Sequence, residues 1–310
     1  MKKPKFVLSL TTRDSDYQAE QAAAAEEAAR RLGIDLQVLY AENDTIMQSQ
    51  QLLNIIQSNS GAHPDGIIFE PVGGTGLPQV ARAAVGAGIG WVVLNREVDY
   101  VAELRRRFKV PIFAVTSDHE EIGRIQGRQI ETLLSQGGSM LLIHGPAANL
   151  DAKQRTNGMY ETKPAQVQVK QIRGDWTEAG AYKSVSSWLE LSTSREARID
   201  LVAAQNDVMA MGARKAFQGI ADNALRDRWL ALPYLGVDGI PKTGQTWVRG
   251  GQLTATVVVP PDAGIAIELL AQAVQTASMP PEKSVAIPKS FPSIEELAKK
   301  IPRKSQAAAT

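Results

Sequence analysis

The feature that most restricts the fold is a repeated alternation of short apolar runs with longer amphipathic stretches. Each run is rich in Val, Ile or Leu, which is typical of strands buried on both faces of a parallel sheet. The expected strands are Phe6–Leu10, Asp35–Tyr40, Gly66–Glu70, Trp91–Asn95, Ile112–Thr116, Met140–His144, Val167–Ile172, Leu201–Ala204, Tyr234–Val237 and Thr254–Val258. Helical patterns fill the segments between them, so the sequence predicts an α/β protein.

Helix boundaries are clearest after the first strand. The pattern predicts a helix from about Tyr17 to Leu32 that ends at Gly33, a residue suited to the left-handed C-cap conformation. Ser15-Asp16-Tyr17-Gln18 has the spacing of a capping box before it, and Ser117-Asp118-His119-Glu120 repeats that signature.

The number of strand–helix units predicts two doubly wound, Rossmann-like parallel sheets rather than one. A length of 310 residues also favours two domains of roughly 150 residues each. The first five strands would form one sheet and the strands from Met140 through Val237 the second, with the break near Thr116–Asp118. The helix after Thr254–Val258 can return to the first domain.

Composition excludes several classes of function. The chain has 34 basic and 33 acidic residues, a balance that argues against a nucleic-acid partner. It has no Cys, and its three His have no metal-ligand spacing, so we expect no metal and no cofactor. Since no nucleophile–base motif is present, we expect a binding protein and not an enzyme.

The amino terminus leaves the compartment open. The apolar run Phe6–Leu10 is about half the length that the core of a signal peptide needs. The protein is therefore periplasmic if a signal peptide was removed before Met1, and cytoplasmic if Met1 is the true start. No window of the sequence is apolar enough for a transmembrane helix.

Residues that directly follow parallel strands are the candidates for a binding site, because open α/β sheets bind ligands at the carboxyl ends of their strands. Aromatic rings cover the C–H faces of a sugar, while Arg, Asn and Asp side chains bind its hydroxyls. This combination predicts a small polyhydroxylated ligand enclosed between two domains. Each residue also has a structural alternative, such as a helix cap, a surface anchor or an ion pair. The candidates are Thr11, Arg13, Ser15, Tyr17, Asn95, Arg96, Arg155, Trp176, Asn206 and Asp238.

The polar triplet Gln205-Asn206-Asp207 ends one of these strands and begins a helix. We expect Asn206 to contact the ligand, Asp207 to cap the helix and Gln205 to support them. Asn206 is then expected to meet Arg155 and Asp238 from its own domain, and Arg96 from the other.

The chain resembles the ribose-binding type of periplasmic sugar-binding protein, whose fold is shared by the effector domains of lac-repressor-type regulators. The resemblance covers about residues 5 to 290. The motifs that carry it are "AQNDVMAMGARKAF" at Ala204–Phe217, "LGVDG" at Leu235–Gly239, "LNR" at Leu94–Arg96, "TSD" at Thr116–Asp118 and "LTATVVVPPDAGI" at Leu253–Ile265.

The resemblance implies two lobes that close around a ligand. They would be joined by a three-crossing hinge at Ser117-Asp118, at Val258–Pro260 and near Lys283–Ile287. One lobe would hold residues 1–117 and 259–284, and the other 118–258 and 285–310. The resemblance also places Arg96, Arg155, Asn206 and Asp238 on ligand-binding positions, Tyr17 and Trp176 on an aromatic sandwich, and Thr11 and Ser15 on the first loop.

The chain departs from the family pattern in ways that bear on the ligand. Asn95 stands where the family usually has Asp, and Val259 where it has a polar amide. Arg13, Arg96 and Arg155 would then face Asp238, which suggests a ligand that carries a carboxylate or phosphate. Equally, Asp residues of the first loop can neutralise Arg13.

Two functions follow from the resemblance. The first is a solute-binding protein, expected to be a monomer, that delivers a sugar-like ligand to an ABC transporter or to a sensor in the membrane. The alternative is the effector-binding domain of a lac-repressor-like regulator that lacks its DNA-binding part.

Overall fold

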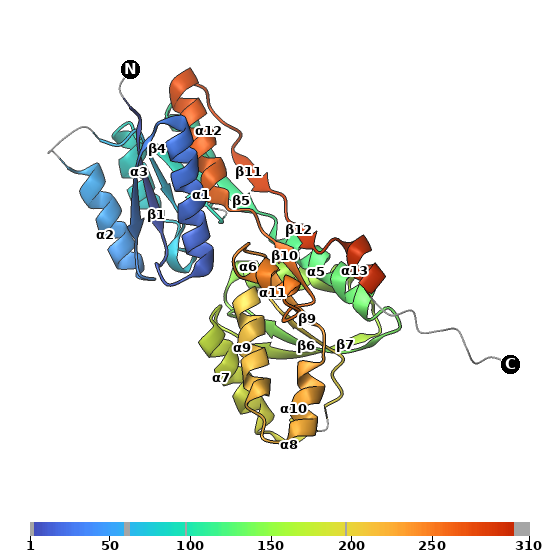
Figure 1. Ribbon diagram of the computed structural model, residues 1–310. Coiled ribbons are helices and arrows are strands. Elements are labelled where there is room, and N and C mark those ends of the chain that lie inside the picture. The colour runs from blue at the N-terminus through green and yellow to red at the C-terminus, as the bar shows by residue number, and fades with distance from the viewer. Residues whose placement is uncertain (1–2, 59–62, 97, 196, 301–310) are drawn as a thin grey trace. The chain divides into compact units, whose positions relative to one another are not determined.

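The computed structural model describes residues 3–58, 63–96, 98–195 and 197–300 (Figure 1). The chain divides into two compact units. Unit 1 holds the chain up to Ser117 and then Pro260–Ile287, whereas unit 2 holds Asp118–Val259 and the chain from Pro288. The chain therefore passes between the units three times. Residues 1–2 and 301–310 of the predicted lobes lie outside the described residues.

Unit 1 is built on a six-stranded sheet in the order β11-β5-β4-β3-β1-β2, and every neighbouring pair is parallel. Its strands are β1 (Lys5–Leu10), β2 (Asp35–Tyr40), β3 (Gly66–Phe69), β4 (Gly90–Leu94), β5 (Ile112–Ser117) and β11 (Lys283–Ala286). Its helices are α1 (Asp16–Leu32), α2 (Thr45–Ile56), the 3₁₀ turn η1 (Val72–Gly74), α3 (Pro78–Gly86), α4 (Tyr100–Arg107) and α12 (Asp262–Thr276).

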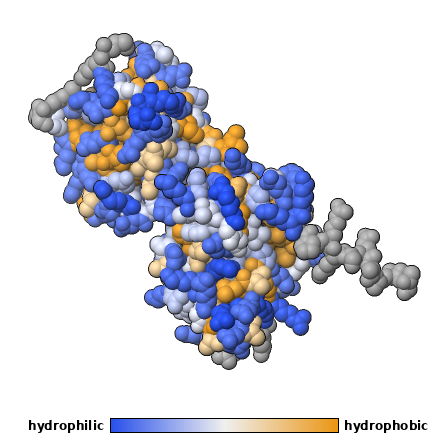
Figure 2. Space-filling view, in the orientation of Figure 1, coloured by the Kyte–Doolittle hydropathy of each residue, from blue (hydrophilic) through white to orange (hydrophobic). Residues whose placement is uncertain are grey.

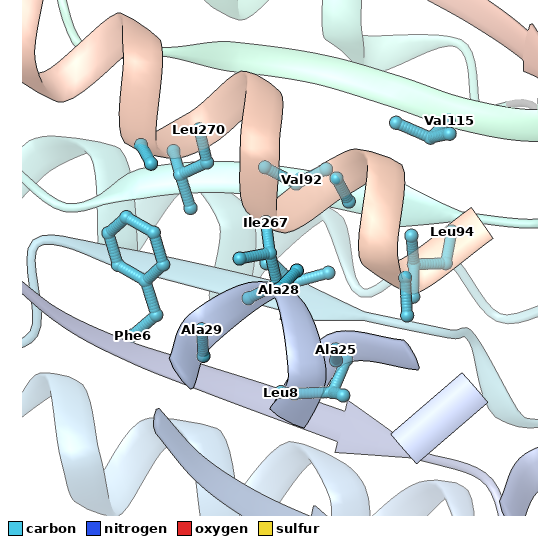
Figure 3. Packing of buried hydrophobic residues seen from close by; sticks show 14 of the residues in the cluster. Phe6, Leu8, Ala25, Ala28, Ala29, Val92, Leu94, Val115, Ile267 and Leu270 are labelled. Carbon is cyan, nitrogen blue, oxygen red and sulfur yellow. The ribbon is translucent and has the colours of Figure 1, made fainter. Parts of the chain in front are cut away.

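Helices cover both faces of this sheet. Ala25 and Ala28 of α1 and Ile267 of α12 pack on one face against Phe6 and Leu8 of β1 (Figure 3). The small Ala side chains let α1 approach the strand and its neighbour α12 closely. The other face is covered by α2, α3 and α4. The two apolar layers are the core that holds the carboxyl ends of the strands in place.

Unit 2 is built on a second six-stranded sheet in the order β12-β10-β9-β8-β6-β7, parallel except for the antiparallel edge pair β10–β12. Its strands are β6 (Gly138–His144), β7 (Val167–Arg173), β8 (Leu201–Ala204), β9 (Tyr234–Asp238), β10 (Ala255–Val258) and β12 (Lys289–Phe291). Its helices are α5 (His119–Leu133), α6 (Leu150–Thr162), α7 (Glu178–Leu189), α8 (Ser192–Arg195), α9 (Asp207–Gln218), α10 (Asn223–Leu230), α11 (Gly244–Arg249) and α13 (Ile294–Lys300).

The two faces of the second sheet differ in composition. One face packs on α7, α9, α10 and α11 and includes an aromatic cluster in which the rings of Phe217 and Trp229 stack 4.5 Å apart. The other packs on α5, α6 and α13 through aliphatic residues such as Ile130, Met159 and Leu297. These layers fix α6 and α9, whose amino-terminal halves carry residues discussed below.

The predicted fold class, two doubly wound α/β sheets, is confirmed. The ten predicted strands correspond to β1–β10, and α1 ends at Gly33 in the left-handed conformation, with a φ of 68°. The strands β11 and β12 are additions, because three or four residues in a Pro- and Lys-rich tail carry too little periodicity to be recognised.

The described residues include no helix that is long and apolar enough to cross a membrane. Figure 2 shows hydrophilic residues intermixed with hydrophobic ones on the visible surface of both units.

Candidate functional site

In unit 2 the structure brings three of the predicted residues together around one guanidinium. Arg155, on the second turn of α6, is only 8% exposed. Its Nη1 lies 3.7 Å from Oδ1 of Asp238 and donates to the backbone oxygen of Gln205 at 2.5 Å. Its guanidinium carbon lies 5.4 Å from the centre of the Trp176 ring. A cation, an anion and an aromatic ring therefore meet at the carboxyl edge of the sheet.

Gly145 is what allows the indole to lie there. A Cβ at this position would lie 2.3 Å from Cζ2 of Trp176, closer than any side chain tolerates. The strand β6 ends at His144, so this close approach is made by the first residue after the strand. Trp176 thus packs directly on the backbone of the sheet edge.

Three of the predicted residues have a strained backbone. The φ angles of Asn95, Trp176 and Asp238 are 54°, 72° and 99°, values that L-residues other than Gly rarely adopt. Such a conformation costs on the order of 1–3 kcal/mol for each residue. All three lie at the end of a strand or within three residues of it, although Glu42, Asn43, Leu77 and Ala277 also have positive φ.

The prediction that Asp207 caps α9 is wrong, whereas the expected contact of Asn206 with a ligand stays a prediction. Asn206 is the N-cap of α9: its backbone is extended, and its Oδ1 accepts from the amide of Met209 at 2.9 Å. Its Nδ2 donates to the backbone oxygen of Trp176 at 3.0 Å. Asn206 therefore links the helix to the loop that carries the indole.

Asp207 is instead a buried support for the loop after β9. Its carboxylate accepts from Oγ1 of Thr256 at 2.6 Å and from the amide of Gly239 at 2.8 Å. Gly239 is required here, since its φ is 58° and a Cβ would lie 2.7 Å from Cα of Val258. By holding the amide next to Asp238, Asp207 contributes to the position of the predicted ligand-binding carboxylate.

Burial also sets the charge of these two acids. It raises the pKa of Asp207 well above its usual range, and the charge of Asp238 raises it further against the opposing bonds from Thr256 and Gly239. Burial raises the pKa of Asp238 to about 7, while Arg155 lowers it. Burial therefore favours the protonated form of both acids, and the charge of Arg155 opposes this at each of them.

Gln205 has the supporting role that was expected. Its amide donates to the backbone oxygen of Ala152 at 3.0 Å and to Oγ1 of Thr156 at 2.8 Å, both on α6. Its Oε1 accepts from the amide of Gly145 at 2.8 Å. One side chain thus fixes α6, and with it Arg155, to the sheet edge.

In unit 1 the structure adds a carboxylate that the sequence analysis did not identify. Glu70 directly follows β3 and is 4% exposed. It accepts from Nε2 of Gln18 at 2.8 Å and from Nδ2 of Asn95 at 3.2 Å. A carboxylate therefore lies beside Asn95, and it belongs to Glu70, which had been taken as the last residue of a strand.

A second buried acid of unit 1 lies at the start of α12. Asp262 is fully buried, and its two oxygens lie 3.5 Å from Oγ of Ser117. Burial first, and then the charge of Glu70, raise the pKa of Asp262 to about 7, while Ser117 lowers it. The sequence signal for this residue was only its position at a helix start, which is common for Asp.

The predicted residues of the first loop have separate surroundings. The amide of Thr11 donates to Oε1 of Gln18 at 3.2 Å, and the hydroxyl of Tyr17 accepts from Nε2 of Gln21 at 2.7 Å. Ser15 is at the N-cap position of α1 but makes no side-chain cap bond, so the predicted capping box does not form.

Two predicted Arg residues of unit 1 differ in exposure. Arg13 is exposed, with its guanidinium 4.5 Å from the centre of the Tyr40 ring. Arg96 follows Asn95 and is half-buried. Among the described residues, no group of three or more His, Cys, Asp or Glu could hold a metal ion.

Known proteins resemble this chain over most of its length. A family model described as "Periplasmic binding protein domain" matches residues 6–278. The D-allose-binding periplasmic protein of Escherichia coli (strain K12) is 27% identical over 261 residues, which cover 83% of this chain and 79% of that protein. The ribose import binding protein RbsB of Salmonella typhimurium is 24% identical over 267 residues, which cover 84% of this chain and 81% of that protein.

Solved structures share the fold. An ABC transporter periplasmic solute binding protein from Actinobacillus succinogenes 130z, with bound D-allose, matches with a TM-score of 0.79 and 23% identity over 96% of this chain and 100% of that one. A solute binding protein from Bacillus halodurans C-125, with bound myo-inositol, matches with a TM-score of 0.76 and 21% identity over 96% and 98%. The resemblance found from the sequence is confirmed: this chain belongs to the periplasmic binding protein family.

Proposed function

We propose that the chain is a solute-binding protein that captures a small sugar or sugar-like molecule and delivers it to an ABC transporter. The names of the relatives, which bind D-allose and ribose, support this class of ligand. They also favour transport over the regulator alternative. The observation that carries the proposal is the arrangement of Arg155, Asp238 and Trp176 at one sheet edge.

The chemistry of this edge suits a sugar ring. The indole offers an apolar face to the C–H groups of a pyranose or furanose, while Arg155 donates to hydroxyls and Asp238 accepts from them. Asn206 keeps a second lone pair and a second amide hydrogen beyond its two bonds to the protein. We include Thr11, Arg13, Ser15, Tyr17, Asn95 and Arg96 of unit 1 as further ligand-binding candidates, with Glu70 added.

We further propose that the ligand is uncharged. Arg155 already has an acidic partner in Asp238, and Glu70 adds a carboxylate beside Asn95 in unit 1. Arg13 is exposed and lies over the Tyr40 ring. These positions supply no unopposed cluster of guanidinium groups of the kind that selects a phosphate or carboxylate.

Titration calorimetry tests both proposals. We expect binding of at least one of D-allose, D-ribose and myo-inositol, and no heat with ribose 5-phosphate or D-ribonate at the same concentrations. Binding of the anionic compounds alone would show that the ligand is a sugar acid or sugar phosphate. We also propose that the protein acts in the periplasm as a monomer with a membrane permease as its partner; light scattering of the purified protein checks the monomer.

A further inference from the structure

His119 and Asp151 form a buried pair next to Arg155 that was not among the predicted site residues. His119 is the first residue of α5 and Asp151 lies in the first turn of α6; they are 5% and 7% exposed. Nδ1 of His119 accepts from Nε of Arg155 at 3.4 Å, and its Nε2 lies 3.6 Å from Oδ1 of Asp151. The imidazole thus lies between a cation and an anion, both from α6.

These contacts specify the form of the ring. A guanidinium can only donate, so Nδ1 of His119 accepts the bond from Arg155 only while it carries no proton. The neutral ring then carries its hydrogen on Nε2, the nitrogen that faces Asp151. Nε of Arg155 is held in this way by His119, while its Nη1 faces Gln205 and Asp238.

The packing of α5 on α6 fixes the distance between the two side chains. A Cβ on Gly123 of α5 would lie 2.1 Å from the backbone oxygen of Arg155, and a Cβ on Gly158 of α6 would lie 1.9 Å from that of Glu120. The two backbones therefore cross in direct contact. Because the helices cannot slide without a clash, His119 and Arg155 keep their relative places.

We propose that neutral His119, oriented by Asp151, is a positioning residue that holds the guanidinium of Arg155 against Asp238, and that protonation of its ring weakens ligand binding. The second part rests on the proposed function, since it assumes that Arg155 contacts the ligand. Protonation places an N–H opposite an N–H and a second positive charge beside the guanidinium where little water can screen it. Asp151 offsets part of that repulsion. Binding is therefore strongest when the ring is neutral and falls as the pH falls through the titration of the ring.

Other charged groups around α5 do not alter the expected direction, which is weaker binding at lower pH. Beyond the guanidinium, Asp238 of β9 lies 3.7 Å from Nη1 of Arg155, and the buried Asp207 of α9 interacts with the charges of both. On α5 itself, Glu120 and Glu121 form ion pairs with Arg124. The strand β10 carries no charge, and the charged side chains of β12 and α13 are exposed.

Nuclear magnetic resonance of the His rings tests the positioning itself without any ligand. The chain has three His, so His63 and His144 are internal controls in the same spectrum. We expect His119 of the wild-type protein to carry its hydrogen on Nε2 at high pH. Arg155→Met should raise the titration midpoint of His119, because both the donor and the positive charge are removed. Asp151→Asn should lower it, and the control midpoints should stay unchanged.

An Nδ1–H tautomer, or a His119 midpoint that neither variant moves, would overturn the proposal. Arg155→Lys is the second variant if Arg155→Met does not fold. It keeps the charge but lacks the Nε donor, so the midpoint should still rise, though by less.

Calorimetry between pH 8 and pH 5 with D-allose, D-ribose and myo-inositol tests the effect on binding. We expect the wild-type affinity to fall about tenfold over this range. His119→Asn places an amide oxygen near the position of Nδ1, and this oxygen can accept from Arg155 at every pH. The variant should therefore bind the sugar as the wild type does at pH 8, and its affinity should decrease much less between pH 8 and pH 5. Any dependence of affinity on pH that comes from Asp238 is common to the wild type and His119→Asn.

The outcomes separate the two levels of inference. An equal slope in His119→Asn and wild type would refute the link between His119 and binding. If none of the three compounds binds, the proposed ligand class is wrong, while the ring titration still decides whether His119 positions Arg155.

Discussion

The substitution Asp262→Asn gives a quantitative test of the buried acid in unit 1. The pKa of Asp262 is raised from 3.8 to about 7, first by burial and then by the charge of Glu70. A carboxyl group with a raised pKa in the folded state stabilises that state fully below pH 3.8. This stability is lost as the pH rises through about 7. A pKa raised by about three units lowers the free energy of unfolding by about 4 kcal/mol at high pH relative to low pH. About 2–3 kcal/mol of this decrease occurs between pH 5 and pH 8.

Asn has the shape of Asp, does not titrate, and can still accept from Oγ of Ser117. We therefore expect Asp262→Asn to remove that loss, so that the variant gains about 2–3 kcal/mol of unfolding free energy relative to the wild type between pH 5 and pH 8. Urea unfolding followed by hydrogen exchange of the β1 and β4 amides measures unit 1 separately. Asp14→Asn, at an exposed acid of the same unit, is the matched control.

Two results would refute the argument. If the wild type and Asp262→Asn differ by the same amount at every pH, Asp262 does not titrate in this range. If the variant is less stable at pH 8 than at pH 5 relative to the wild type, the carboxylate is stabilised in the folded state and the assigned direction of its pKa is wrong.

Three further predictions concern unit 2. Arg155→Met should weaken binding of the sugar found by calorimetry by about 2–4 kcal/mol, or about 30- to 1,000-fold, because a buried hydrogen-bonding cation is lost. Gly145→Ala should displace Trp176, since the added Cβ would lie 2.3 Å from its ring; we expect a shift in tryptophan fluorescence and at least roughly tenfold weaker binding. Asn206→Ala should lower the unfolding free energy by about 1 kcal/mol through loss of the α9 cap, whereas Asn206→Asp should retain the cap, as measured by urea unfolding.

Matched variants distinguish these effects from general damage. Arg173→Met removes an exposed guanidinium of β7 and should leave affinity unchanged. Gly86→Ala adds a Cβ with no atom within 4 Å and should alter neither fluorescence nor binding. Equal affinities of Arg155→Met and Arg173→Met would remove Arg155 from the proposed site.

Central strands could be predicted because two-sided burial requires continuous apolar runs, as in β3, β4 and β8, whereas the edge strands β2 and β7 carry polar residues among their apolar ones. The short strands β11 and β12 could not, since their pairing depends on strand edges that only the folded sheets create. For β12 even the direction is reversed. Long elements with their own periodicity can thus be recognised in the sequence. Short strands that form only by pairing with the edge of a folded sheet cannot.

The place of a candidate residue at a strand end was predictable where a polar residue breaks an apolar run, as at Asn206 and Asp238. Glu70 was missed because it extends such a run by one residue, and its burial depends on Gln18 and Asn95 from other segments. The cap of α9 was assigned to Asp207 although Asn206 forms it, because Asn and Asp have nearly equal preference for the N-cap and the sequence cannot decide which of two neighbours takes it. His119 and Asp151 lie 32 residues apart and meet only where α5 crosses α6.

The two bonds of Asn206 have a consequence for how the ligand preference of such a chain can change. The same amide group caps α9 and holds the loop of Trp176, so a mutation here acts on the helix end and on the position of that loop at once. Asp238 lies at the end of β9 and pairs with Arg155 of α6, so a mutation there leaves the cap of α9 in place. Selection or engineering for a new ligand is therefore expected to retain Asn206 and to vary residues around it. A substitution of Asn206 would have to gain more in ligand affinity than the protein loses in stability when α9 loses its cap.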